Sequence, residues 1–79
     1  MGEKSRLAWR CHRGMREMDL LFETFLLDEY DNLSIEQKLL FDKFLDEADV
    51  DIYSWIIGTS NPENDAYTFF IRRLQKIHS

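Results

Sequence analysis

The residues best suited to recognise another molecule lie in one short segment, from position 10 to position 17. Its charged and titratable side chains surround a glycine: Arg10, His12, Arg13, Arg16 and Glu17. An arginine fork donates paired hydrogen bonds to carboxylates and can also reach carbonyl oxygens, which is recognition chemistry rather than bond-breaking chemistry. Gly14 costs a helix about 1 kcal/mol relative to alanine. It therefore indicates either a corner with a positive φ angle or a place where another protein's backbone comes close.

Arg13 and Glu17 allow two interpretations. They are four residues apart and share one face if this stretch is helical. They then form either a surface ion pair worth under roughly 1 kcal/mol or a fork that is presented to a partner. The residues alone leave both open.

Catalytic and metal-binding patterns are weak by comparison. Cys11 and His12 are adjacent, and adjacent side chains on a helix point about 100° apart, so they share a proton poorly. A zinc site needs three or four ligands at set spacing, which these two and the distant His78 do not supply. The glycines are too far apart for a phosphate-binding loop. We expect no enzyme, no metal site and a cysteine packed on a helix.

Length and charge limit the remaining classes of protein. The chain has 79 residues, enough for one small domain with a thin core, so we expect a single helical domain over 1–79 with a flexible N-terminus at 1–5. The net charge of −5 is uneven, because residues 1–16 carry five bases against one acid and residues 17–65 carry fourteen acids against two lysines. A nucleic-acid partner held by the N-terminal arginines is disfavoured by this acidic body.

Two further features concern location. No apolar run approaches the roughly 18 residues that a membrane span requires. A single cysteine forms no internal disulfide and suits a reducing compartment. We expect a cytoplasmic protein.

Five helical segments are expected to position the segment 10–17. They cover about 4–11, 15–30, 34–47, a short stretch around 52–56, and a stretch from about 61 to 77. Ser34 with Gln37 forms a capping-box pattern, and Asp49 or Asp51 is expected to cap the fourth helix, which Gly58 ends.

The start of the last helix and the fold class follow from the same patterns. Asn61 followed by Pro62 is expected to begin the fifth helix. Trp55 lies among isoleucines and is expected in the core rather than at an interface. No stretch alternates as a strand does, so the sequence predicts an all-α bundle of five short helices.

The same segment carries a family resemblance. The run Arg13-Gly14-Met15-Arg16-Glu17 resembles the RGxxE signature of the succinate dehydrogenase flavinylation factors, small helical proteins also called FAD assembly factors. The resemblance continues through Tyr30, Leu33, the segment 36–44, the Asp-x-Asp run that leads to Trp55, and Gly58. It covers about residues 6–74, and the combination is more specific than the five-residue motif alone.

This resemblance implies a function. Members are five-helix assembly factors, or chaperones, that bind the flavoprotein subunit of succinate dehydrogenase, and in bacteria often that of fumarate reductase. Binding promotes covalent attachment of FAD to a histidine of that subunit. It also implies that the factor needs no catalytic group of its own. We expect a monomer, the default for so small a charged surface, that binds no cofactor stably by itself. An antitoxin-like or regulatory interaction module is the alternative, and the identity of the partner distinguishes the two.

The signature also assigns residues to the partner contact. It places Arg13, Gly14 and Glu17 there, with Met15 and Arg16 as neighbours and with Trp9 and Arg10 as an extension. One departure is His12, which stands where many members have a second arginine. We expect the charge there to be lower or to depend on pH.

Overall fold

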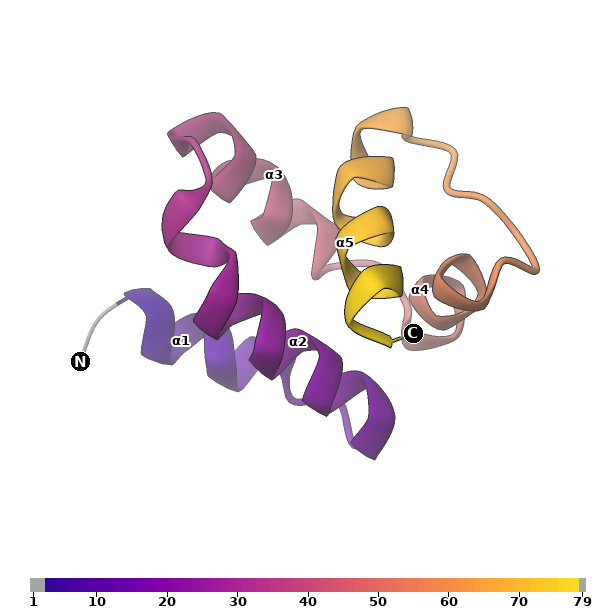
Figure 1. The fold of residues 1–79 in the computed structure, drawn as a ribbon, viewed down its shortest axis with the longest axis horizontal. Coiled ribbons are helices and arrows are strands. Elements are labelled where there is room, and N and C mark those ends of the chain that lie inside the picture. Colours follow the sequence, from indigo (N-terminus) through magenta and orange to yellow (C-terminus); the bar gives the residue numbers. More distant parts are fainter. Residues whose placement is uncertain (1–2, 79) are drawn as a thin grey trace.

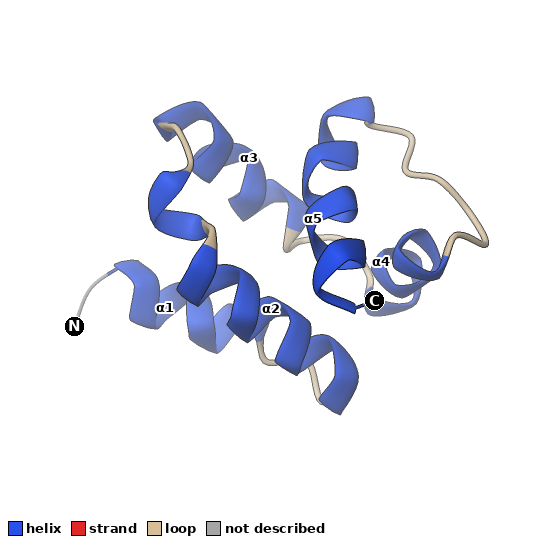
Figure 2. Ribbon diagram, in the orientation of Figure 1, coloured by secondary structure: helices blue, strands red, loops and turns tan. Residues whose placement is uncertain are grey.

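Five α-helices and two 3₁₀ turns make up most of residues 3–78, the part of the chain that the computed structural model describes (Figure 1). The elements in order are α1 (Glu3–Cys11), α2 (Arg16–Asp28), η1 (Tyr30–Asn32), α3 (Ile35–Phe44), α4 (Asp49–Ile57), η2 (Asp65–Tyr67) and α5 (Thr68–His78). Within this range there is no strand (Figure 2), so the predicted all-α class is confirmed. Among the described residues, no helix has the length and apolar character needed to cross a membrane.

The N-terminal segment 1–5, predicted to be flexible, is described only in part. The backbone of residues 3–5 belongs to α1, and Met1 and Gly2 lie outside the described residues.

Helix α2 is at the centre of the packing. It contacts α1 on one side and α5 on another, and α5 also contacts α4 (Figure 1). At the centre of the core lies a group of phenylalanines that α2, α3 and α5 contribute. The fully buried rings are Phe22, Phe25, Phe41, Phe44 and Phe70. Each buried phenylalanine contributes roughly 1.5–3 kcal/mol relative to an exposed one, so this cluster supplies much of the stability of the domain.

Ring contacts show how tightly these helices meet. The ring centres of Phe25 and Phe41 are 5.0 Å apart, and those of Phe41 and Phe70 are 5.3 Å apart. Trp55 of α4 is buried and lies 6.2 Å from Phe44 between ring centres. Its predicted place in the core is confirmed.

Two helix ends form as predicted. Ser34 Oγ accepts a hydrogen bond from the Gln37 backbone N–H at 3.1 Å, and Gln37 Oε1 accepts one from the Ser34 N–H at 2.9 Å. This is the expected capping box. Gly58 follows α4 with a φ angle of +86°, the left-handed conformation that ends many helices.

The predicted start of the fifth helix is wrong. Asn61 and Pro62 lie in a loop, and α5 begins only at Thr68. The amide oxygen of Asn64 accepts a hydrogen bond from the Ala66 N–H at 3.0 Å and so caps η2. Residues 63–66 are all exposed, and the first buried side chain is Tyr67, so no apolar face holds a helix against the core before that point.

The predicted cap of the fourth helix is also wrong. Ala48 occupies the N-cap position and no side chain caps there. Asp49 and Asp51 lie inside the first turn, where the positive end of the helix dipole favours carboxylates. The Asp49 carboxylate accepts a hydrogen bond from the Arg13 side chain.

Candidate functional site: the Gly14 corner

The connection between α1 and α2 is a tight corner of four residues, 12–15, which we call the Gly14 corner. Gly14 has a φ angle of +82°, which confirms the structural reason for a glycine here. It is exposed, and a Cβ atom placed on it would meet nothing within 4 Å. The space above this backbone is therefore open, as the approach of another protein requires.

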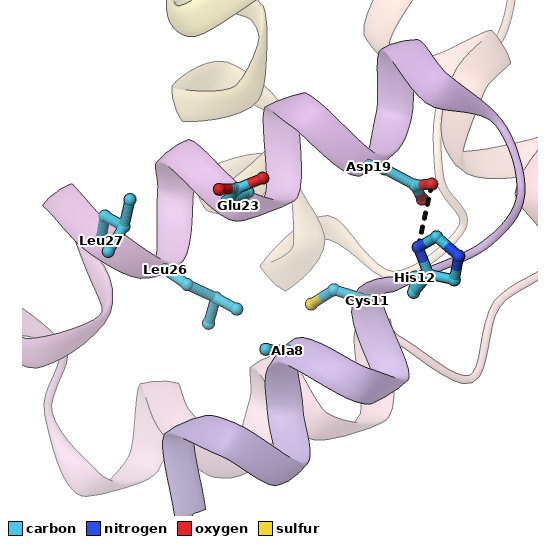
Figure 3. A pocket seen from close by; sticks show the side chains of 7 residues that line it. All are labelled: Ala8, Cys11, His12, Asp19, Glu23, Leu26 and Leu27. Carbon is cyan, nitrogen blue, oxygen red and sulfur yellow. Dashed lines mark ion pairs between the residues drawn. The ribbon is translucent and has the colours of Figure 1, made fainter.

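Asp19 of α2 fixes the corner. One carboxylate oxygen accepts a hydrogen bond from the Arg13 backbone N–H at 2.7 Å, and the other lies 3.2 Å from His12 Nδ1 (Figure 3). Asp19 was not among the predicted site residues. The available signal was an acidic side chain in the first turn of a helix, where it can satisfy nearby N–H groups.

The Arg13 side chain points into the protein. Only 9% of its surface is exposed, and its guanidinium carbon lies 5.6 Å from the centre of the Phe22 ring. Nη1 donates to the Glu47 carbonyl at 3.0 Å and to Asp49 Oδ1 at 2.5 Å, and Nη2 donates to the Leu45 carbonyl. The fork thus holds the loop between α3 and α4. Neither the surface pair with Glu17 nor an open fork describes it.

The other predicted residues divide between the surface and internal contacts. Trp9 is 79% exposed, and Arg16 is exposed at the start of α2. Met15 packs partly buried against the core. Arg10 forms ion pairs with Asp42 of α3 and with Asp46, which follows α3.

Glu17 reaches the far end of the chain. Its Oε1 lies 2.5 Å from Nε2 of His78, an exposed residue of α5. Exposed residues at the Gly14 corner and the start of α2 are His12, Gly14, Arg16 and Glu17, whereas the Arg13 side chain is buried. The exposed Trp9 ring stacks beside His12, with 6.5 Å between the ring centres.

Cys11 is buried beside this corner, with 3% of its surface exposed. Burial raises the pKa of its thiol from 9.0 to about 12, an effect that Arg13 and Arg10 only partly oppose. Within the described part of the chain, no group of three or more histidine, cysteine or acidic side chains could hold a metal ion.

Alkylation of Cys11 is therefore expected to be very slow in the folded protein. Since the thiolate is the nucleophile, iodoacetamide at pH 8 should react at least about 100-fold more slowly than in denaturant. The unfolded chain loses this proton near pH 9 and the folded chain near pH 12, so the stabilising contribution of Cys11 falls as the pH rises between these values. Mass spectrometry of the labelled chain measures the rates, and equal rates in both states would contradict this burial.

The structure is a small all-α domain with an open glycine corner and an internal arginine brace. Comparison with known proteins gives the family. The family described as "Flavinator of succinate dehydrogenase" matches residues 5–78, and the chain belongs to it.

Relatives named "FAD assembly factor SdhE" agree with this assignment. The protein of Legionella pneumophila (strain Paris) is 44% identical over 63 residues, which is 80% of each chain. That of Coxiella burnetii is 34% identical over 74 residues, 94% of this chain and 90% of the relative. That of Idiomarina loihiensis is 41% identical over 70 residues, 89% of this chain and 78% of the relative.

Proposed function

We propose that this protein binds the flavoprotein subunit of succinate dehydrogenase and promotes the covalent attachment of FAD to it. The observation that carries the proposal is the match of residues 5–78 to the family of succinate dehydrogenase flavinators. The open backbone of Gly14 supports the place of contact, because it is flanked by the exposed Trp9 and Arg16 side chains. Exposed aromatic and arginine side chains are those most often found at the energetic centre of protein interfaces.

The protein acts in this proposal as a chaperone rather than as an enzyme. FAD is the substrate of the partner and not a resident cofactor of this chain. When the subunit docks on the Gly14 corner, one of its conformations is stabilised, the one in which bound FAD and the acceptor histidine are aligned. Binding therefore increases the population of that conformation. The thiol nearest the corner, that of Cys11, is buried and protonated, so it is unsuited to act as a nucleophile.

The role of Arg13 in this proposal is to keep the corner in shape. Its fork joins the corner to the loop at 45–49, while the partner meets Gly14, Arg16, Glu17 and Trp9. We further propose that the protein acts as a cytoplasmic monomer and also serves the flavoprotein subunit of fumarate reductase.

Covalent flavin fluorescence on a denaturing gel tests the function. The purified apo flavoprotein subunit of succinate dehydrogenase is incubated with FAD, with and without this protein, and the fluorescent band is followed in time. We expect the band to grow several-fold faster with the protein present. The control is the same subunit incubated with a known assembly factor, which should accelerate flavinylation. If that control works and this protein gives no acceleration, the proposal is contradicted. An antitoxin-like or regulatory module would also give no acceleration.

A further inference from the structure

A groove runs between α1 and α2 directly beside the Gly14 corner (Figure 3). Its volume is about 410 Å³, within the range of roughly 300–1,000 Å³ that is typical of binding pockets. The side chains that line it are Ala8, Cys11, His12, Asp19, Glu23, Leu26 and Leu27. Ala8 and Cys11 come from α1, His12 from the Gly14 corner, and the others from α2.

The walls of the groove are mainly apolar. Ala8 and Cys11 face Leu26 across it, and Leu27 forms one end with 70% of its surface exposed (Figure 3). The His12–Asp19 pair closes the other end, next to Gly14. Leu27 continues the apolar lining to the end of the groove, so an apolar side chain of a partner can pack along it.

The charge on the rim is negative and only partly compensated. Asp19 uses both oxygens, one on the Arg13 N–H and one on His12. Glu23 is exposed and makes no ion pair or hydrogen bond with any residue whose side chain the structure describes. A cationic group over the groove would therefore find a free carboxylate next to apolar surface.

We propose that this groove receives a segment of the flavoprotein subunit that carries an apolar side chain followed by a lysine or arginine. The apolar side chain packs between Ala8 and Leu26, and the cation pairs with Glu23. This inference rests on the proposed function and extends the contact from the corner along α1 and α2. The occupant is a peptide segment and not FAD, because the carboxylates of Glu23 and Asp19 would repel a diphosphate.

Two substitutions test the groove, each with a matched control. Glu23→Lys reverses the rim charge, and Asp28→Lys makes the same change in charge at an exposed position of the same helix that does not line the groove. Ala8→Trp fills the groove without a change of charge, and Leu39→Trp places an indole at an exposed position of α3.

The dissociation constant for the apo subunit is measured by calorimetry at low and high salt, and thermal unfolding verifies that each variant is folded. Glu23→Lys should weaken binding about tenfold, with a smaller effect at high salt. Ala8→Trp should weaken binding at least as much at both salt concentrations, and the two controls should stay within about twofold of the parent.

The outcomes separate this inference from the proposed function. If the parent protein neither binds the subunit nor accelerates flavinylation, the proposed function fails and the groove proposal with it. If the parent does both and the two groove variants match their controls, only the groove proposal is overturned. If sedimentation shows that the isolated chain dimerises and that Glu23→Lys abolishes the dimer, a second copy occupies the groove and the proposal is wrong.

Discussion

Gly14→Arg is expected to remove most of the acceleration of flavinylation, by at least tenfold, while the protein stays helical. A side chain at this position projects from the open surface of the corner, where a partner's backbone would otherwise approach. The φ angle of +82° adds a strain of about 1–2 kcal/mol, since non-glycine residues disfavour this conformation. The denaturing-gel assay measures the effect, and circular dichroism verifies the fold.

Gly58→Arg is the matched control for strain. Gly58 has a φ angle of +86°, and a Cβ there would also meet nothing within 4 Å, so the same substitution costs a similar free energy at a different place. Gly14→Asn is the control for bulk, because asparagine tolerates positive φ better than most residues and is smaller than arginine. If Gly58→Arg lost as much activity as Gly14→Arg at equal stability, the corner would not be the contact.

Arg13→Ala is expected to lower the free energy of unfolding by about 3 kcal/mol. The change leaves the Leu45 and Glu47 carbonyls and the Asp49 carboxylate without the fork that binds them. A domain of this size is stable by roughly 4–12 kcal/mol, so the loss is a large part of the total. Urea denaturation followed by tryptophan fluorescence or circular dichroism measures it.

Arg10→Ala is the comparison for Arg13→Ala. Arg10 pairs with Asp42 and Asp46, but these carboxylates are mostly exposed, and exposed pairs contribute under about 1 kcal/mol. Arg13→Lys keeps the charge without the planar fork and should fall between the two. Equal losses for Arg13→Ala and Arg10→Ala would show that Arg13 is not a brace.

Features that depend on a few neighbouring residues could be predicted from the sequence. The Ser34–Gln37 capping box spans four residues, and the left-handed Gly58 needs only the end of its own helix. The start of α5 could not be predicted in this way, because the Asn61–Pro62 pattern lies in a loop and α5 begins only at Thr68. The first side chain buried after this loop is Tyr67, and its burial depends on the whole core.

The site was harder to predict, because its partners are distant in sequence. Arg13 contacts residues 32 to 36 positions away, and Glu17 contacts His78, 61 positions away. The four-residue separation of Arg13 and Glu17 predicts that they contact each other on a helix. It gives no information about contacts with residues far away in the sequence. The sequence identified the right segment but not which of its side chains would be used internally.

The internal position of Arg13 has a consequence for how the cell could use this molecule. A peptide that ends after α2 would contain the complete RGxxE motif but not the three oxygen atoms that hold the arginine, which lie at positions 45, 47 and 49. The motif reaches its shape only when α3 and α4 have joined the domain. Under the proposed function, fragments and partly synthesised chains lack these oxygen atoms and are expected to bind the flavoprotein poorly, so that binding requires the folded domain.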